Sequence, residues 1–291
     1  MTLIIKEKAV TCLLCKVPLI AIAKVDTITG KTMKYYEIRG GQRKQSPLGH
    51  DATYCDACIQ KMDPAVIANY LNKYDILHLH YLTHIDNVPS MLANGIMSFK
   101  KVKSLGLLHY DISDNYVQAR REHRSIPNIN RSIHSYVPLY FATQTPMHYV
   151  ITHSDKTKKH HSIISQDNIV FLDINAQSIF QTPGVFFTDG NAASHDTAFY
   201  TNLADLDKLN WQNINHPCSY PQGYDPEWRR TKASEVLVPD NIPPKYISRI
   251  VVFSQETATK LCIIVKRLYP KIYSTQFQYS DDIVRSYYFV S

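Results

Sequence analysis

The stretch KASEVLVP, residues 232–239, directs both the assignment of fold class and the search for a functional site. Val236, Leu237 and Val238 form an apolar run rich in β-branched residues, which predicts a buried strand. Glu235 heads this run. A buried strand seldom carries a carboxylate without a partner, because desolvating the charge is costly. The glutamate therefore predicts either a chemical role or an ion pair with Arg229, Arg230 or Lys232.

Short strands and scattered helices are predicted around this stretch. Residues 75–84, DILHLHYLTH, alternate with the period of two of a strand, and residues 168–174, NIVFLDI, form a second strand. Asp63 and Pro64 are typical of a helix start. The chain has neither a GxGxxG nor a GxxxxGK[ST] motif, which argues against Rossmann and P-loop sites. These features together indicate an α+β fold.

A further helix is predicted directly after the first of these strands. Asp86 and Asn87 offer a cap for residues 88–94, and Gly95 is the expected stop. Within residues 75–84, we expect Tyr81 and Thr83 to share one face, and His80 to point to the other.

Length and composition are those of a globular protein. The 291 residues are enough for one large domain or two smaller ones, and 44% are hydrophobic. No apolar run approaches the roughly 18 residues of a membrane helix, and the first residues are too short an apolar patch for a secretory signal. We therefore expect a cytoplasmic protein without membrane association.

The positive charge is concentrated near the N-terminus. The formal net charge is +7, and residues 1–62 contain ten Lys/Arg against five Asp/Glu. Lys34, Arg39 and Arg43 are interleaved with tyrosines, so they are candidates for contacts with a nucleic-acid backbone. The alternative is an ordinary solvated basic face.

Four cysteines fall into two pairs with metal-ligand spacing. Cys12 and Cys15 form one CxxC pair, and Cys55 and Cys58 form the other. Two such knuckles complete a tetrahedral zinc site, whereas disulfides are unlikely partners in a cytosolic chain. The residues between the pairs alternate like strands with a turn near Thr29-Gly30-Lys31. We predict that residues 1–62 form a zinc ribbon with a structural zinc.

Five segments resemble, in order and spacing, the DarT family of DNA ADP-ribosyltransferase toxins. They are YLTHIDNVPSMLANGIMS (81–98), VQARR (117–121), YVPLYFATQTPMHYV (136–150), FTDGNAA (187–193) and KASEVLVPDNIPP (232–244). The resemblance covers roughly residues 74–290.

The resemblance implies an ADP-ribosyltransferase fold, in which a split antiparallel sheet surrounds an NAD cleft. It also implies transfer of ADP-ribose from NAD to a base, typically thymine, in single-stranded DNA. A macrodomain antitoxin, DarG, is the usual partner of the family. We therefore expect a zinc ribbon (1–62), a linker helix (63–73) and a DarT-like ADP-ribosyltransferase domain (74–291) acting as a toxin or phage-defence effector.

Glu235 matches the family's catalytic glutamate. Loss of nicotinamide from NAD builds positive charge on the ribose, and a fixed carboxylate stabilises that charge. We expect Glu235 on a rigid strand with a mouth open to substrate. The family's functional arginine falls in Gln118-Ala119-Arg120-Arg121, where a guanidinium would clamp phosphate or offset charge on the base. Arg121 lies further into the match, and Arg120 stays an alternative.

The NAD contacts implied by the resemblance lie on three segments. The family usually has His-x-Thr where this chain has Tyr81-Leu82-Thr83, so either Tyr81 replaces the histidine or a register slip brings in His80. Asn87 matches a family asparagine. Asn191 occupies a position where the family often has His or Asn.

Residues 120–134 are expected to cover the cleft. Arg124 and Arg131 are candidates there for DNA phosphate contacts, with a solvated loop as the alternative.

Two alternatives remain open at the level of sequence. The same chemistry could act on RNA, guanine or protein, which the Tyr81 departure and the additional ribbon would permit. Alternatively, the chain is a non-enzymatic zinc-ribbon module that binds nucleic acid.

Overall fold

The computed structural model divides the chain into two compact units. One comprises Met1–Lys73 with Phe180–Gly184, and the other comprises Tyr74–Ile179 with Val185–Ser291. The structure describes residues 3–11, 18–27, 29, 32–39, 41–45, 51–55, 63–107, 109–113, 115–127, 129, 131–153, 164–217, 225–268, 277–278 and 281–289. None of the helices in these residues is both long enough and apolar enough to cross a membrane.

The first unit contains two small antiparallel sheets and a helix. Strands β1 (Leu3–Thr11), β2 (Pro18–Asp26) and β3 (Thr32–Arg39) form one sheet, and β4 (Gly41–Gln45) pairs with β5 (Asp51–Cys55). The hairpin predicted around residues 29–31 is confirmed, because β2 pairs with β3 in antiparallel register.

Helix α2 (Pro64–Lys73) begins as the sequence predicts. Asp63 Oδ1 accepts hydrogen bonds from the backbone N–H groups of Ala65, at 2.8 Å, and Val66, at 3.4 Å. The carboxylate therefore satisfies donors that the first turn of a helix leaves without partners.

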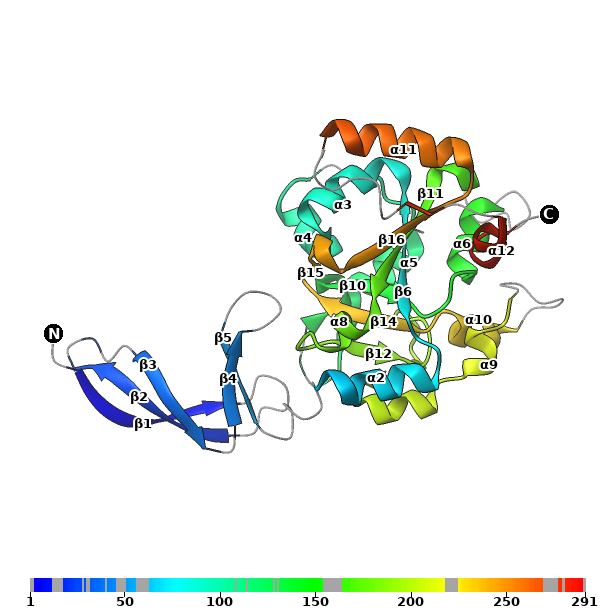
Figure 1. Cartoon of the computed structure of the whole chain (residues 1–291). Coiled ribbons are helices and arrows are strands. Elements are labelled where there is room, and N and C mark those ends of the chain that lie inside the picture. The colour runs from blue at the N-terminus through cyan, green and yellow to red at the C-terminus, as the bar shows by residue number, and fades with distance from the viewer. Residues whose placement is uncertain are drawn as a thin grey trace. The chain divides into compact units, whose positions relative to one another are not determined.

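The second unit is built on an eight-stranded sheet with the order β13-β12-β14-β10-β6-β11-β16-β17 (Figure 1). All neighbours are antiparallel except β16 and β17, which are parallel. Along the chain, the strands are β6 (His78–His84), β10 (Tyr136–Tyr140), β11 (Ile169–Asn175), β12 (Phe186–Thr188), β13 (Phe199–Tyr200), β14 (Glu235–Pro239), β16 (Ile247–Val252) and β17 (Phe277–Gln278). The predicted α+β class and largely antiparallel sheet are confirmed.

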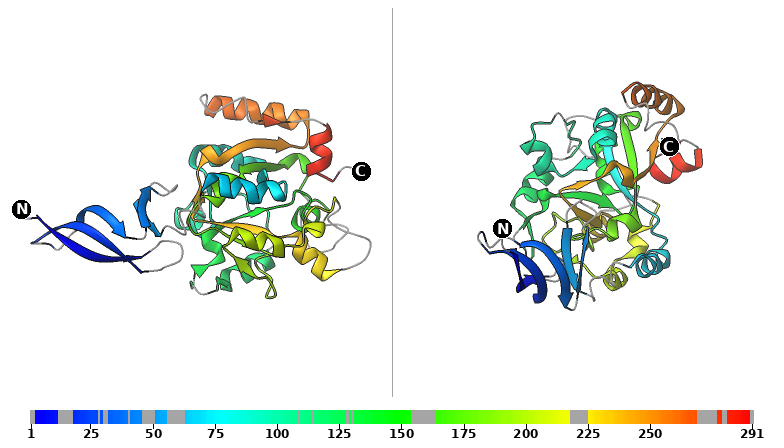
Figure 2. Two further views of the ribbon diagram at one scale, coloured as in Figure 1. Left: turned by 60° about the horizontal axis from the view of Figure 1, so that its bottom comes forward. Right: turned by 60° about the vertical axis from the view of Figure 1, so that its left-hand side comes forward.

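Helices and two small two-stranded sheets surround this sheet; α11 and α12 both pack against β16 (Figure 2). The helices are α3 (Val88–Asn94), α4 (Phe99–Ser104), α5 (Asn115–His123), α6 (Pro146–Thr152), α8 (Ala176–Phe180), α9 (Trp211–Ile214), α10 (Pro226–Lys232), α11 (Gln255–Leu268) and α12 (Asp281–Tyr287). The two-stranded sheets pair β7 (Ile96–Met97) with β15 (Asn241–Ile242), and β8 (Ser125–Ile126) with β9 (Arg131–Ser132).

Gly95 ends α3, as predicted. Its φ is 83°, and a Cβ there would lie 2.3 Å from the carbonyl oxygen of Ile242. Only glycine fits this approach without strain. The predicted cap of the same helix is wrong, because the side chain of Asn87 makes no capping hydrogen bond.

The sheet separates in its middle. Strands β6 and β10 pair only at Tyr140 and His80, so the rest of β6, from Tyr81 to His84, has no ladder partner in β10. Pro138, in β10, lacks the N–H group that a continued ladder would need. This separation creates the space in which the candidate site lies.

Candidate active site

A cavity of about 750 Å³ opens where β6 and β10 separate. Its wall includes Tyr81, Leu82 and Thr83, consecutive residues of β6, because the cavity lies along the edge of β6 that has no partner in β10. The volume lies within the range of small-molecule sites. Among the sequence-predicted residues, Tyr81, Thr83, Arg120, Arg121 and Asn191 line the cavity.

Glu235 and Arg121 form a buried ion pair beside this cavity. Arg121 Nη1 lies 3.2 Å from Oε1 and 3.0 Å from Oε2 of Glu235. The backbone N–H of Ala192 donates to Oε1 at 3.1 Å. Glu235 is 0% exposed and Arg121 is 8% exposed. The cation and the amide together offset the cost of burying the carboxylate.

The expectation that Glu235 faces an open mouth is wrong. The carboxylate is not among the groups that line the cavity, whereas Arg121 is, so the arginine lies between the carboxylate and the space. Arg121 Nη2 is buried and has no hydrogen-bond partner among the described residues. The exposed Arg120 also reaches the cavity wall, but only Arg121 is paired with Glu235.

The contacts of Arg230 and Lys232 among the described residues do not support their alternative ion pairs with Glu235. Arg230 pairs with Asp189, at 2.9 Å, and with Glu227, at 2.7 Å. Lys232 Nζ donates to the carbonyl oxygens of Ile214 and His216. Neither cation is available to the catalytic candidate.

Tyrosines flank the pair on the cavity side. Tyr140 lies directly opposite Glu235 in the β10–β14 ladder and lines the cavity, as does Tyr81 from β6. Burial raises the pKa of both hydroxyls well above the usual value, so both are protonated at neutral pH. Tyr81 can therefore donate a hydrogen bond to a bound molecule, and Tyr140 can do so in exchange for its weak hydrogen bond to Met147 Sδ, at 3.4 Å.

Thr83 and Tyr110 form a second part of the wall, and Asn87 joins them. Asn87 Nδ2 donates to Thr83 Oγ1 at 3.0 Å and to the carbonyl of Tyr110 at 2.9 Å. Asn87 Oδ1 accepts from the backbone N–H of Tyr110 at 2.9 Å. Thr83 and Tyr110 line the cavity and Asn87 does not. Asn87 therefore acts by fixing these two residues.

His80 lies away from the cavity wall. Its Nδ1 is 2.7 Å from Asp173 Oδ1, and its ring meets Tyr287 edge-on at 5.3 Å. The buried Asp173 carboxylate holds the imidazole in this position, so the structure does not support His80 as an NAD contact. Tyr81 lines the cavity instead.

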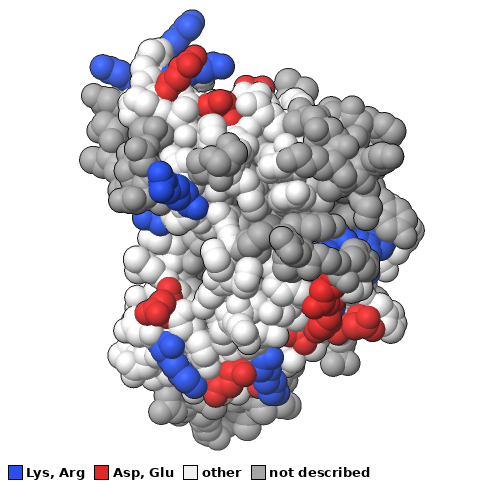
Figure 3. Space-filling model, turned by 90° about the vertical axis from the view of Figure 1, so that its right-hand side faces the viewer, with Lys and Arg blue, Asp and Glu red and all other residues white. Residues whose placement is uncertain are grey.

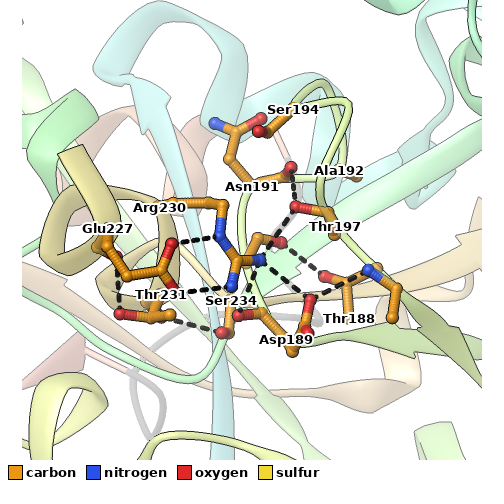
Figure 4. A network of polar contacts seen from close by, with 12 residues as sticks. Thr188, Asp189, Asn191, Ala192, Ser194, Thr197, Glu227, Arg230, Thr231 and Ser234 are labelled. Atoms are coloured by element: carbon orange, nitrogen blue, oxygen red, sulfur yellow. Dashed lines mark hydrogen bonds and ion pairs between the residues drawn. The ribbon is translucent and has the colours of Figure 1, made fainter.

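The loop after β12 is held by a dense polar network (Figure 4). Thr188 Oγ1 donates to the carbonyl of Gly190 at 2.7 Å and accepts from the Glu235 N–H at 3.0 Å. Asp189 accepts from Arg230 and from the Ala198 N–H, at 2.9 Å each. This network positions Asn191 on the cavity wall and the N–H of Ala192 on Glu235.

Sequence patterns did not identify Ala192 as a partner of Glu235. A backbone donor carries no side-chain signal, and the only hint was the turn-forming character of FTDGNAA.

The two arginines predicted to contact DNA are bound to the protein itself. Arg124 donates to the carbonyls of Ser194, His195 and Thr197. Arg131 pairs with Asp240, and its guanidinium lies 4.8 Å from the Tyr136 ring. These contacts fix loops of the protein, and the phosphate contacts of Arg124 and Arg131 stay predictions.

On one face of the molecule (Figure 3), the charges of the described residues do not mark a nucleic-acid interface. On the face in Figure 3, basic and acidic side chains of the described residues are interspersed. Lys34, Arg39 and Arg43 lie on β3 and β4, but their side chains are outside the described residues, so their predicted contacts stay predictions. The same holds for the zinc ligands: Cys12, Cys15 and Cys58 are outside the described residues, and Cys55 is described only as the end of β5.

Comparisons with known proteins agree with this geometry. A family model for the ssDNA thymidine ADP-ribosyltransferase DarT matches residues 80–280. A DNA ADP-ribosyl transferase of Thermus sp. (strain 2.9) is 30% identical over 65% of this chain and 87% of its own length. A transferase–glycohydrolase fusion protein of Thermosipho africanus is 32% identical over 63% of this chain, and the match spans only 44% of the fusion protein.

Solved structures share the fold. Thermus sp. 2.9 DarT in complex with ADP-ribosylated ssDNA superposes with a TM-score of 0.62 at 24% identity, covering 74% of this chain and 97% of that one. The same protein in complex with NAD+ gives a TM-score of 0.59. The second unit therefore has the DarT ADP-ribosyltransferase fold. Since the family match extends over more than half of the residues, the chain belongs to the DarT family.

Proposed function

We propose that this chain is an NAD-dependent ADP-ribosyltransferase that modifies a nucleobase of single-stranded DNA. The observation that carries the proposal is the buried Arg121–Glu235 pair at the wall of the cavity in a chain of the DarT family. A buried ion pair is a poor source of stability, so its position beside a cavity favours a chemical role.

The chemistry of glycoside cleavage fits the two residues. As the bond between nicotinamide and ribose breaks, the sugar becomes cationic, and the Glu235 carboxylate stabilises that charge. The attacking base nitrogen loses a proton, which the same carboxylate can accept. Because Arg121 lies between Glu235 and the cavity, this step requires the guanidinium to turn away from at least one carboxylate oxygen.

NAD binding is supported by the size and lining of the cavity. Tyr81, Thr83 and Asn191 present hydroxyl and amide groups on its wall, which suit ribose hydroxyls and a carboxamide. A relative, Thermus sp. 2.9 DarT, has been solved in complex with NAD+.

Thymine in single-stranded DNA is the acceptor that we propose. The description of the matching family names thymidine, and the Thermus sp. relative has been solved with ADP-ribosylated ssDNA. The test is incubation of the protein with NAD and separate pools of single-stranded DNA, RNA and protein, followed by mass spectrometry. We expect one added ADP-ribosyl group on thymine-containing DNA. A mark confined to RNA or protein would overturn the assignment.

A toxin role with a macrodomain antitoxin extends the proposal, and we place the reaction in the cytoplasm. The support is a relative in which the transferase is fused to a DNA ADP-ribosyl glycohydrolase, an activity opposite to transfer. Co-expression of a DarG-type glycohydrolase should restore growth of cells that express this chain. Continued growth arrest would remove the partner assignment. A phage-defence role remains part of the same proposal.

The N-terminal unit is proposed to hold one structural zinc ion. The two CxxC pairs support it by spacing, and the strands of this unit resemble a ribbon. Elemental analysis should give one zinc per chain, lost on substitution of Cys12 and Cys55. Its basic strands, with Lys34, Arg39 and Arg43, are proposed to bind DNA, which predicts weaker DNA binding when these residues are replaced.

A further inference from the structure

Four polar residues of the cavity wall form a continuous hydrogen-bonded chain. Ser113 Oγ is 2.5 Å from Asp111 Oδ1, and the Ser113 N–H donates to the same oxygen at 2.9 Å. Gln118 Nε2 is 2.5 Å from Ser113 Oγ, and Gln118 Oε1 is 2.8 Å from His134 Nε2. All four residues line the cavity. None of them is explained by the transfer chemistry.

The hydrogen bonds that join these four residues allow only one assignment of donors and acceptors. A carboxylate only accepts, so the single hydroxyl hydrogen of Ser113 points to Asp111. Ser113 Oγ must then accept from the Gln118 amide, which turns Gln118 Oε1 toward His134. The imidazole therefore carries its hydrogen on Nε2, and Nδ1 keeps a lone pair. No hydrogen bond reaches that Nδ1 from the described residues.

These hydrogen bonds connect helix α5, which carries Arg121, to strand β10, the neighbour of the strand that carries Glu235. Gln118 and Arg121 lie on α5, which has nine residues and a largely polar sequence, so the helix depends on tertiary contacts. His134 belongs to the short helix η2 (Ile133–Ser135), which leads directly into β10. Strand β10 pairs with β14, which begins at Glu235.

We propose that His134 and Gln118 are positioning residues, which hold α5 so that Arg121 meets Glu235 at the cavity. The link passes from β10 through His134 to Gln118, and Arg121 follows one helical turn later. The hydrogen bonds of Ser113 and Asp111 fix the amide of Gln118 for this contact. The expected effect on the transfer rate rests on the proposed transferase function. The placement of Arg121 by these hydrogen bonds does not depend on that function.

The charges around His134 support a neutral ring. Burial, and then the nearby Arg121, lower the pKa of His134 below its usual value. The other charged groups that face it are Lys103 of α4, Glu122 of α5 and Asp111. At neutral pH the imidazole is thus uncharged and adds no second cation beside Arg121. Protonation at lower pH would add one and would weaken the placement of Arg121.

The first test is spectroscopic and needs no enzymatic activity. Long-range proton–nitrogen spectra of histidine-labelled full-length protein, with His134→Phe used to assign the signal, report the tautomer. We expect the Nε2–H form, and a mixture of both forms in Gln118→Leu. An Nδ1–H form in the wild type, or a spectrum unchanged by Gln118→Leu, would overturn the proposal.

The second test measures the transfer rate to single-stranded DNA. The imidazole of His134 lies 4.8 Å from the ring of Phe99. His134→Phe keeps an aromatic ring at this position and removes the Nε2–H donor. We expect kcat to fall about 10-fold or more in His134→Phe and in Gln118→Leu, with KM for NAD changed less, and the double variant to be no slower than the slower single variant. Losses that multiply in the double variant, or wild-type kcat in both single variants, would overturn the proposal.

A variant that changes the charge at Gln118 distinguishes a positioning role of Gln118 and His134 from a general disruption of the structure. Gln118→Glu keeps an acceptor for His134 and places a carboxylate beside it, which raises the pKa of the imidazole. The acid side of the rate–pH profile should therefore move to higher pH, whereas His123→Gln, an exposed change on the same helix, should leave it in place. An unmoved profile in Gln118→Glu would contradict the positioning role. If the wild-type protein does not modify DNA but His134 has the Nε2–H form, the proposed function is wrong and the hydrogen-bonded connection between His134 and Gln118 is still supported.

Discussion

Glu235 and Asp173 are two carboxylates buried in the same sheet, and they differ in how completely their neighbours satisfy them. Both are 0% exposed. Asp173 accepts from His80 at 2.7 Å, from the hydroxyl of Tyr287 at 2.6 Å and from Arg249. Among the residues that the structure describes, the Glu235 carboxylate has one side-chain partner, Arg121, and one backbone donor, the N–H of Ala192.

A buried carboxylate with a structural role and one with a chemical role differ in the contacts around them. Around Asp173, three side chains from β6, β16 and α12 converge on one carboxylate away from the cavity wall. Around Glu235, the single cation lines a cavity and has a buried Nη2 without a partner among the described residues. Burial and pairing are common to both sites, and only the second leaves hydrogen-bonding capacity for a substrate.

Replacing Asp173 should cause the largest loss of stability. Asp173→Asn leaves His80 and Arg249 without their anion, so the free energy of unfolding should fall by about 3 to 5 kcal/mol. Urea unfolding measures it. The exposed Asp86→Asn is the matched control and should cost less than about 1 kcal/mol. Equal losses of unfolding free energy in Asp173→Asn and Asp86→Asn would contradict a structural role for the Asp173 carboxylate.

Replacing Arg121 should affect catalysis more than folding. Lysine keeps a charge for Glu235 but lacks the planar fork, so Arg121→Lys should slow transfer about 100-fold, roughly 3 kcal/mol of barrier. Single-turnover rates measure it. Arg120→Lys, at the exposed neighbouring position, should slow transfer much less. The reverse order would assign the functional arginine to Arg120.

Acid should destabilise the protein through Asp173. Burial alone would raise the pKa of this carboxyl, but hydrogen bonds from His80, Tyr287 and Arg249 lower it from 3.8 to about 2. A lowered pKa contributes stability that is complete above the unfolded value and is lost as the pH falls through the folded value. The free energy of unfolding should therefore drop by about 2 kcal/mol more in wild type than in Asp173→Asn as the pH falls from about 5 to about 2. Parallel curves for the two proteins would contradict this origin.

Replacing Arg131 should have the smallest effect. Its ion pair with Asp240 is partly exposed, so Arg131→Gln should cost less than about 1 kcal/mol of stability and leave transfer to DNA within about twofold of wild type. Transfer rates at several DNA concentrations check this. A selective rise in KM for DNA would restore the predicted phosphate contact.

Local sequence signals predicted what depends on local structure. The Asp63 cap and the Gly95 stop are confirmed because each uses hydrogen bonds to groups a few residues away in the chain. Periodicity identified β6, and the apolar run after Glu235 identified β14 as a buried strand. The family resemblance identified the fold that surrounds them.

Long-range pairing explains what sequence could not predict. Asn87 was expected to cap a helix, but its amide instead joins Thr83 to Tyr110. Alternation places neighbouring residues of a strand on opposite faces, yet Tyr81 and Leu82 both line the cavity, which lies along the edge of β6 that has no partner in β10. The contact of Ala192 with Glu235 uses a backbone donor. These features depend on which segments meet in the folded chain.

The most direct test of the account compares Glu235→Gln with Asp173→Asn at equal concentrations of folded protein. The measurement is the single-turnover rate of ADP-ribose transfer from NAD to a thymine-containing single-stranded oligonucleotide, read by mass. We predict that Glu235→Gln lowers the rate about 1,000-fold with little change in unfolding, and that folded Asp173→Asn keeps a rate near that of wild type. A Glu235→Gln protein that transfers as fast as wild type, or two variants that lose the rate equally, would contradict the account.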